Sequence, residues 1–345
     1  MASLYEPKKI LVTGGAGFIG SHVVELLCTK YPHYKITVLD SLQYCANLKN
    51  LEAISTLIKF VEGDIRSTEL VRYIIQTHEI DTILHFAAET HVDNSFGNSF
   101  TFTETNVMGT HVLLEASRQS ETVKRFLHVS TDEVYGEASL LGGSSFESDS
   151  VLAPTNPYSA SKAAAEMLVN AYGTSYNLPY VITRGNNVYG PRQFPEKAIP
   201  KFIHLLHRNH KVPIHGNGLA LRSYMHVSDA AAAFDLILHK GENHSIYNIG
   251  AQEERTVVSV AKDLCKSLNK DAHSHIEYVK DRAFNDRRYF VDSSKLEALG
   301  WKQEKNWTQG LSETVEWYLT SVEEKYWGEV DSALEAHPFP CIKNK

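Results

Sequence analysis

The sequence predicts an α/β protein with a Rossmann-like, doubly wound parallel sheet, followed by a smaller C-terminal α+β lobe. Two observations carry this prediction. From residue 8 to about residue 190, short β-branched apolar runs alternate with longer amphipathic segments. The first of these runs also leads directly into a glycine-rich turn. Buried parallel strands read as continuous apolar runs, and their alternation with helices is typical of doubly wound sheets.

Six runs are predicted to be buried strands of this sheet. They are Lys9–Val12, Lys35–Leu39, Lys59–Val61, Thr82–Phe86, Arg125–Val129 and Tyr180–Thr183. The stretch Ala138–Asn156, rich in Gly, Ser and Pro, is expected to be a long loop. Loops of that length in a compact domain often border binding sites.

Beyond residue 190 the pattern loosens, and three prolines stand close together at Pro191, Pro195 and Pro200. Helical patterns then follow at Ile199–Asn209, Ser228–Lys240, Val257–Leu268 and Gln309–Glu323. We therefore expect residues 8–190 to form a nucleotide-binding domain that carries the catalytic residues. Residues 191–330 are expected to form mainly a substrate-binding lobe, and the chain could cross back between the two.

Composition narrows the classes of function. The chain has 345 residues, of which 43% are hydrophobic and 22% are charged, a profile typical of globular proteins. The net charge of -7 and the pI near 6.2 give no basic surface, so nucleic acid is not an expected partner. No apolar run has the length of a signal peptide or a membrane span, so we expect a cytoplasmic protein without membrane contact.

Neither a metal site nor a cysteine-based redox centre is expected. His204, His207 and His210 share one face of a probable helix, but no carboxylate completes a ligand set there. A partly exposed helix face is the better explanation. The four cysteines stand far apart without a Cys-x-x-Cys pair, which argues against a disulfide framework or a dithiol centre.

The glycine-rich turn after the first strand predicts a dinucleotide site. Glycines at Gly14, Gly17 and Gly20 allow a tight turn and let a pyrophosphate approach the backbone at the start of the next helix. Asp40 ends the second strand, twenty positions after Gly20, where an acid can bind ribose hydroxyls. Because such an acid would repel a 2′-phosphate, the pattern favours NAD over NADP.

Other segments are weaker candidates for the same site. Gly63-Asp64-Ile65 follows the third strand and could flank an adenine, and Ala87-Ala88 are small enough for close approach of the cofactor. The full set of predicted cofactor contacts is Gly14, Gly17, Phe18, Ile19, Gly20, Asp40, Asp64, Ile65, Ala87, Ala88, Thr105, Tyr158 and Lys162.

Tyr158 and Lys162 lie one turn apart at the start of an Ala-rich helix. A neighbouring ammonium, together with a positively charged nicotinamide, is expected to lower the pKa of the tyrosine towards that of a general base. With the upstream glycine-rich turn, this Tyr-x-x-x-Lys motif resembles the short-chain dehydrogenase/reductase superfamily, in its extended, sugar-nucleotide form.

A pair of carboxylates distinguishes the predicted site. Thr131, Asp132 and Glu133 follow a strand at its carboxyl end, where ligands bind in open α/β sheets. Oxidation of an alcohol needs only a tyrosine base, a hydroxyl partner and NAD, whereas eliminating water also needs an acid and a base. Standing alone, the pair could equally be two solvated loop carboxylates.

The Thr-Asp-Glu string resembles the dTDP-glucose 4,6-dehydratases, and the similarity covers nearly the whole chain. It includes the motifs His85–Asp93, Asn186–Pro191 and Pro195–Pro200, and Arg222 before Val227-Ser228-Asp229. The resemblance implies that Tyr158, with Thr131 on the same oxygen, deprotonates the hydroxyl of sugar carbon 4 while hydride passes to a tightly bound NAD. Glu133 then takes the proton of carbon 5, Asp132 protonates the departing hydroxyl of carbon 6, and the hydride returns to carbon 6.

The resemblance also implies substrate contacts and partners. The predicted substrate residues are Thr90, Asn187, Lys197, Arg222, Arg282, Asn285 and Tyr289. The segment 284–290 departs from the Gly-His-Asp of bacterial thymidine enzymes and resembles the dehydratase domain of plant UDP-rhamnose synthases. UDP-glucose is therefore the expected substrate, with a homodimer of helices Asn106–Ser120 and Pro157–Ala171 and a downstream epimerase/reductase as pathway partner.

Three other functions stay open at this point. They are a dTDP-glucose 4,6-dehydratase, a nucleotide-sugar epimerase on the same fold, and a catalytically silent NAD-binding module. Epimerases usually lack the acid-base pair, and a silent module would not need Tyr158, Lys162, Asp132 and Glu133 together.

Overall fold

The computed structural model describes residues 5–137, 144–148, 150–281 and 288–336. Within these ranges a seven-stranded, fully parallel sheet has the order β10-β6-β5-β4-β1-β2-β3. Its strands are β1 (Lys9–Thr13), β2 (Lys35–Asp40), β3 (Ile58–Glu62), β4 (Thr82–His85), β5 (Arg125–Thr131), β6 (Tyr180–Gly185) and β10 (Ser245–Ile249). The predicted fold class is confirmed, and all six predicted strands are present.

Helices cover both faces of the large sheet. On one face lie α1 (Phe18–Lys30), α8 (Val227–Lys240) and α11 (Ser294–Ala298). The other face carries α2 (Thr68–Thr77), α5 (Gly109–Gln119) and α6 (Pro157–Tyr176). Each face therefore has its own apolar core, with the continuous apolar strands between them.

Short helical turns connect these elements. They are η1 (Leu48–Ile54), α3 (Val92–Gly97), α4 (Ser99–Phe102), the π-helical turn η2 (Thr103–Met108) and η3 (Asp132–Tyr135). The helix expected from residue 106 begins instead with this π-helical turn and continues as α5. The helix that starts at Pro157 is one turn longer than expected, because its apolar spacing continues to Tyr176.

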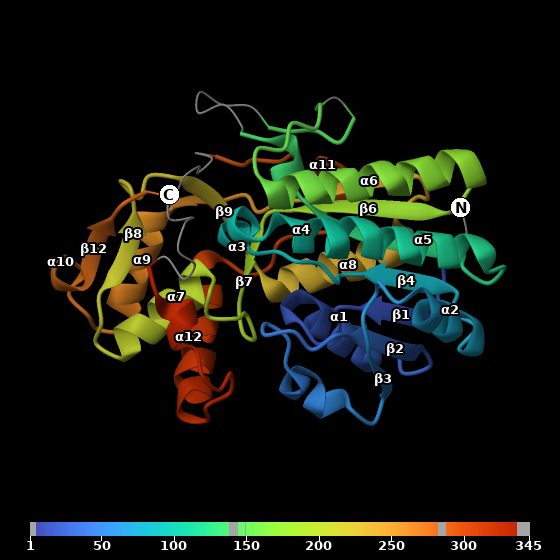
Figure 1. Ribbon diagram of the computed structural model, residues 1–345. Helices are drawn as coiled ribbons and strands as arrows, with labels where there is room; N and C mark the ends of the chain where they lie inside the picture. Colours follow the sequence, from blue (N-terminus) through green and yellow to red (C-terminus); the bar gives the residue numbers. More distant parts are fainter. Residues whose placement is uncertain (1–4, 138–143, 149, 282–287, 337–345) are drawn as a thin grey trace.

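The smaller lobe lies at the left of Figure 1 and has a third apolar core. It contains a three-stranded sheet of β7 (Asn187–Tyr189), β9 (Leu221–His226) and β11 (Glu254–Thr256), and a pair of β8 (Val212–His215) and β12 (Ile276–Val279). Its helices are α7 (Ala198–His207), α9 (Val257–Ser267), α10 (Ala272–His275), α12 (Trp307–Glu323) and α13 (Asp331–Leu334). Between β9 and β11, the chain returns to the large sheet through α8 and β10.

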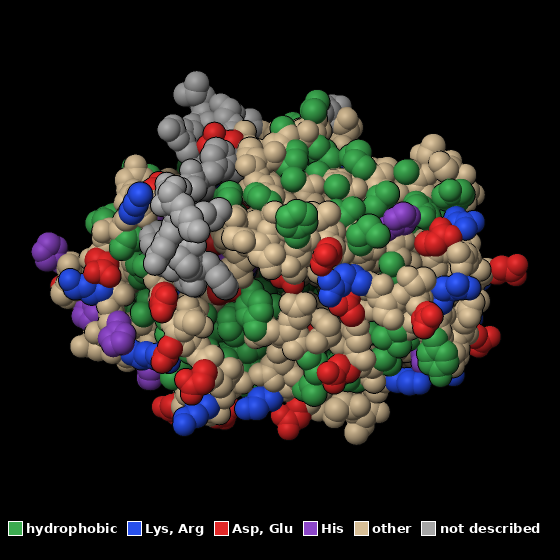
Figure 2. All heavy atoms as spheres, viewed as in Figure 1, with side chains coloured by type: hydrophobic (Ala, Val, Ile, Leu, Met, Phe, Trp, Pro, Cys, Tyr) green, Lys and Arg blue, Asp and Glu red, His purple; other side chains and the backbone are tan. Residues whose placement is uncertain are grey.

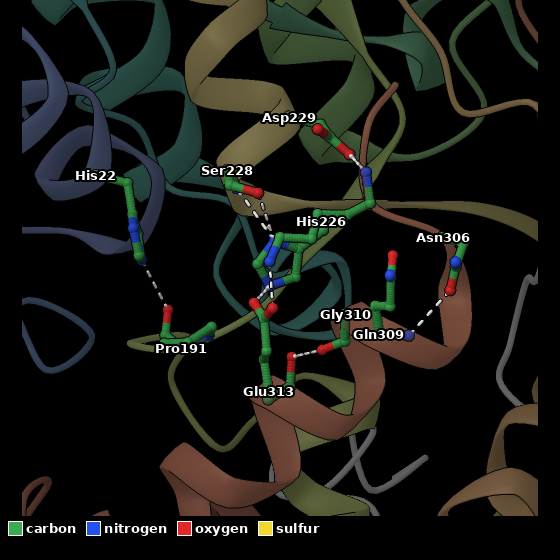
Figure 3. Close-up of polar contacts among 11 residues, drawn as sticks. His22, Pro191, His226, Ser228, Asp229, Asn306, Gln309, Gly310 and Glu313 are labelled. Atoms are coloured by element: carbon green, nitrogen blue, oxygen red, sulfur yellow. Dashed lines mark hydrogen bonds and ion pairs between the residues drawn. The ribbon is translucent and has the colours of Figure 1, made fainter. Parts of the chain in front are cut away.

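The two lobes are joined where α12 meets the end of β9 (Figure 3). His226 ends β9 with its Nε2 atom 4.0 Å from the Glu313 carboxylate of α12, and burial lowers the pKa of this imidazole to about 4. Asp229 of α8 accepts two backbone N–H groups from the segment just before α12. His22 of α1 also contacts the carbonyl of Pro191 at 3.0 Å. These contacts fix β7 and β9 relative to the large sheet.

No helix among the described residues is long and apolar enough to cross a membrane. The same residues contain no group of three metal-ligating side chains. His204 is buried against the ring of Tyr318, and His207 is exposed at the last turn of α7.

Candidate active site

The glycine-rich turn depends on close backbone packing between β1 and β4. Gly14 has φ +71, and a Cβ added there would lie 2.5 Å from the backbone nitrogen of Ala87. A Cβ at Gly20 would lie 2.3 Å from the carbonyl oxygen of Gly14. Side chains at either position would push the turn away from the strand ends. The glycines thus let α1 begin directly above the sheet.

Asp40 fixes the neighbouring loop as well as facing the cavity. Its two carboxylate oxygens accept the backbone N–H groups of Ala16 and Leu42, each at 2.9 Å. Burial raises the pKa of Asp40, and these two hydrogen bonds oppose the shift. The carboxylate therefore holds the glycine-rich turn, and its remaining lone pairs can accept further hydroxyl groups.

A cavity of about 310 Å³ lies above the carboxyl ends of the strands. All the predicted cofactor residues line it, as do Thr131, Asp132 and Glu133. Among the described residues, the hydroxyls of Thr105 and Ser130 are buried at this cavity without a hydrogen-bond partner. Buried polar atoms without partners are costly, so the donor set fits a polar ligand such as a dinucleotide. Asp64 lines the cavity while its carboxylate binds Arg66 at 2.6 Å.

The start of α6 positions the tyrosine and the lysine. Asn156 caps the helix by accepting the N–H of Ser159, whose hydroxyl in turn accepts the N–H of Asn156, and proline fills the first helical position. This boundary places Tyr158 and Lys162 on consecutive turns, and both side chains are buried. Burial lowers the pKa of Lys162 to about 8.

The groups of the chain alone do not lower the pKa of Tyr158, and the effect expected from a bound nicotinamide stays a prediction. Burial, followed by the charge of Glu133, raises the pKa of Tyr158 above its usual range, and the hydrogen bond between Tyr158 and Thr131 opposes this only in part. The spacing of the two residues was correct, but desolvation of the phenolate outweighs the effect of a lysine one turn away.

The carboxylate pair lies where β5 turns into η3. Asp132 is buried, and burial together with the charge of Glu133 raises its pKa to about 7. Asn186 donates to Asp132 Oδ2 at 2.5 Å, and Asn156 donates to Glu133 Oε2 at 3.1 Å. Asp132 can thus exist as a neutral acid close to neutral pH, and it lies beside a carboxylate that can serve as a base.

Sequence reasoning missed Asn186 and Asn156 as parts of this site. Asn156 carried a signal, since Asn before Pro is a common helix start. Asn186 follows β6 directly, and its contact with Asp132 depends on which strands are neighbours, which the sequence did not specify. Glu196 also lines the cavity and accepts a hydrogen bond from Tyr44 at 2.8 Å, linking the loop after β2 to the smaller lobe.

A second cavity, of about 670 Å³, continues into the smaller lobe and shares Glu133 with the first. It brings together the predicted substrate residues Thr90, Asn187, Lys197, Arg222 and Tyr289. The guanidinium of Arg222 lies over the ring of Tyr289 at 4.8 Å. Arg282 and Asn285 lie outside the described residues.

The C-terminal part of the described chain forms one wall of the second cavity. Ala336 lines it, and the carbonyls of Glu335 and Ala336 accept hydrogen bonds from Lys201 and His215, at 3.0 and 2.9 Å. Lys201 and His215 were not predicted. Basic side chains here suit a phosphate or a polar base.

Known proteins resemble the whole of this arrangement. The family model for GDP-mannose 4,6 dehydratase matches residues 11–314. An Arabidopsis thaliana protein named trifunctional UDP-glucose 4,6-dehydratase/UDP-4-keto-6-deoxy-D-glucose 3,5-epimerase/UDP-4-keto-L-rhamnose-reductase is 56% identical over 97% of the chain. The chain spans about half (50%) of the length of that relative.

Two further relatives match over nearly their whole length. The human dTDP-D-glucose 4,6-dehydratase is 48% identical over 96% of the chain and 95% of its own length. The crystal structure of the dTDP-glucose 4,6-dehydratase DesIV from Streptomyces venezuelae, with NAD and TYD bound, is 41% identical. It aligns with a TM-score of 0.88 over 93% of the chain and 99% of its own length.

The close packing of Gly20 against Gly14 predicts that a larger side chain at this position weakens NAD binding. A Gly20→Ala variant should bind NAD at least about tenfold more weakly, because its Cβ would meet the carbonyl of Gly14 and displace the turn. Gly97→Ala is the matched control, since a Cβ there meets nothing within 4 Å. Titration of cofactor-stripped protein with NAD, followed by calorimetry, measures both affinities. Equal affinity for the two variants would contradict the role of this turn.

Proposed function

Because the chain belongs to the GDP-mannose 4,6 dehydratase family, we propose that it dehydrates UDP-glucose to UDP-4-keto-6-deoxyglucose. The observation that carries the proposal is the buried Asp132 next to Glu133, in the same cavity as Tyr158 and Lys162. An enzyme that only oxidises an alcohol or inverts a carbon centre would not need this second acid and base. A silent binding module would need none of the four residues.

The cavity lining supports NAD as the bound cofactor, held by the glycine-rich turn and by Asp40, Thr105 and Lys162. When bound, NAD would supply the hydride acceptor and donor of the reaction. The carboxylate of Asp40, at the end of β2, would face a 2′-phosphate unfavourably, which favours NAD over NADP. Positive charge from Lys162 and a nicotinamide ring would also act against the raised pKa of Tyr158.

Each proton transfer of the reaction is then assigned to one residue of the chain. Tyr158 Oη takes the proton from the hydroxyl of sugar carbon 4. The ketone formed there acidifies the proton of carbon 5, which the Glu133 carboxylate removes. Asp132 donates its carboxyl proton to the hydroxyl that leaves carbon 6. The pKa of about 7 for Asp132 suits this last role, because a general acid works best with a pKa near the working pH.

Substrate contacts are proposed for the second cavity. Lys197 and Arg222 would bind the diphosphate and Asn187 the sugar, since basic side chains match phosphate charge. The relatives named for UDP-glucose are more similar to the chain than the human relative named for dTDP-glucose, which supports UDP-glucose. dTDP-glucose remains the alternative. An epimerase/reductase that consumes the 4-keto product in a coupled assay is the proposed pathway partner.

A competition assay tests the reaction and the nucleotide. With UDP-glucose and dTDP-glucose in one vessel, the alkali-induced absorbance of the 4-keto-6-deoxy sugar should appear, and the kcat/KM ratio should favour UDP-glucose. A pocket that binds the ribose 2′-hydroxyl leaves a polar group unpaired with the deoxy analogue, at a cost of about 1–3 kcal/mol. A ratio at or below one would overturn the uridine assignment, and no product from either sugar would overturn the dehydratase.

The carboxylate pair can be tested separately from the oxidation. Asp132→Asn and Glu133→Gln should still exchange hydride at carbon 4 but form product about a hundred- to ten-thousand-fold more slowly, because each keeps its shape and loses a proton transfer. Tyr158→Phe is the contrasting variant, in which reduced cofactor should not appear on mixing with substrate. Near-normal product formation by both carboxylate variants would remove them from the mechanism.

We also propose that the chain forms a homodimer through the expected helix pair, which is η2 with α5 and α6 in the structure, together with the adjoining α4. Figure 2 shows apolar side chains on this side of the molecule. Phe100, Met108, Met167 and Tyr176 are 82%, 51%, 52% and 55% exposed. Exposed apolar patches of this kind are typical of interaction surfaces. Light scattering should give the mass of two chains, and Met167→Glu should shift it towards one; a wild-type mass of one chain at micromolar concentration would contradict the proposal.

A further inference from the structure

The proposed reaction leaves a proton imbalance between two side chains. Tyr158 gains the proton of the carbon-4 hydroxyl, and Asp132 loses one to the hydroxyl that leaves as water. The proton that Glu133 takes from carbon 5 is replaced at the same carbon when carbon 6 is reduced, so the transfers at Glu133 cancel. Before the next turnover, one proton must leave Tyr158 and one must reach Asp132. The inference below rests on the proposed function.

One hydroxyl group lies between these two side chains. Thr131 Oγ1 donates to Asp132 Oδ1 at 3.2 Å and is hydrogen-bonded to the Tyr158 hydroxyl. It also accepts the backbone N–H of Glu133 at 3.3 Å. A threonine hydroxyl has one proton to donate and two lone pairs to accept. When Tyr158 is protonated and Asp132 is ionised, the Thr131 proton is donated to Asp132, and the two lone pairs accept from Tyr158 and from the Glu133 N–H. This is the state in which a completed turnover leaves the site.

We infer that Thr131 returns the proton from Tyr158 to Asp132 after each turnover. The Tyr158 Oη–H bond breaks and a Thr131 Oγ1–H bond forms, while the original Thr131 Oγ1–H bond breaks and an Asp132 Oδ1–H bond forms. Thr131 ends with one proton, as it began. Its hydroxyl then donates to the tyrosinate and accepts from the Asp132 carboxyl group, so its hydrogen bonds are again complete. With NAD oxidised again, its positive charge and that of Lys162 would act against the raised pKa of Tyr158, so this one transfer restores both the base and the acid.

Asn186 determines which oxygen of Asp132 receives this proton. Its side-chain oxygen accepts the N–H of Ala251 at 3.0 Å, so its amide nitrogen must face Asp132 Oδ2. Because this nitrogen can only donate, Oδ2 is held as an acceptor and the proton arrives at Oδ1, the oxygen that Thr131 contacts. Asn186 is therefore a positioning residue for the acid. The strand register supports this geometry, since Thr131, Gly185 and Ile249 are paired across β5, β6 and β10.

Burial of these groups favours proton transfer through Thr131, because the Thr131 hydroxyl contacts both Tyr158 and Asp132. Tyr158, Thr131, Asp132 and Asn186 are all buried in the described structure. The competing route for the tyrosine proton would run through Lys162, on the next turn of α6, and would leave Asp132 to be reprotonated separately. The two routes differ in a measurable way, because only the first one fails when the hydroxyl of Thr131 is removed.

The test compares Thr131→Val, which removes the hydroxyl at nearly constant shape, with Thr131→Ser, which keeps it. Rapid quench gives the rate of the first turnover and the steady-state rate for each variant. In Thr131→Val the steady-state rate should fall about a hundredfold or more below the first turnover, giving a burst of about one product per active site. Thr131→Ser and the wild type should show no such burst.

An unchanged ratio of the two rates in Thr131→Val would overturn the relay, whatever the loss in the first turnover. That outcome is distinct from failure of the proposed function, in which the wild type itself would give no 4-keto-6-deoxy product. A burst seen equally in Thr131→Ser would also overturn the relay, since that variant keeps the hydroxyl.

Asn186→Leu tests the positioning role through the pH profile. Glu133, Tyr158 and Arg222 are the titratable groups that face Asp132, and hydrogen bonds from Asn186 and Thr131 oppose its raised pKa. Removing the Asn186 donor should raise this pKa further. Because Asp132 must be protonated to act as an acid, the alkaline limb of kcat should move to higher pH. An unmoved limb would overturn the role of Asn186; if the variant does not fold, the Thr131 pair alone decides the inference.

Discussion

The register of the parallel strands is the constraint on which the site depends. β5, β6 and β10 pair so that Thr131, Gly185 and Ile249 stand in one row across the sheet. Asp132 and Asn186 are the next residues along β5 and β6, and Ala251 is the second residue after Ile249, so all three lie beyond the carboxyl edge of the sheet. Asp132, Asn186 and the backbone N–H of Ala251 meet there in a chain of two hydrogen bonds. A shift of one residue in either pairing would break this chain.

Burial at that edge sets the chemistry of the individual groups. Removing a charge from water disfavours the charged form, so burial raises the pKa of Asp132 and Tyr158 and lowers that of Lys162. The three shifts bring an acid and an amine towards neutral pH while they keep the tyrosine protonated. Their pKa values therefore depend on burial and on the amide, hydroxyl and carboxylate groups around them, and not only on their spacing along the chain.

The sequence predicted six strands of the large sheet, the glycine-rich turn and the Tyr158 and Lys162 pair, because each depends on a local pattern. The substrate residues of the second cavity were expected from the family resemblance. The sequence did not predict β10, whose five residues mix polar and apolar side chains and carry no clear period. Without β10, the backbone N–H of Ala251, which orients the Asn186 amide towards Asp132, could not be placed beside Asn186. The burial that raises the pKa of Tyr158 in the protein alone was not anticipated either, since helical spacing reports which residues are near and not how deeply they are buried.

The final positions of the transferred protons distinguish the proposed reaction from others that the same fold could support. An enzyme that oxidises a carbon and reduces it again can return the tyrosine proton to the oxygen from which it came. An enzyme that eliminates water cannot, because that oxygen remains a ketone and the proton that leaves in water comes from the acid. After each turnover its base must lose a proton and its acid must regain one. In this chain the residue next to the acid, Thr131, lies between the two, so a single strand end supplies both the acid and its connection to the base.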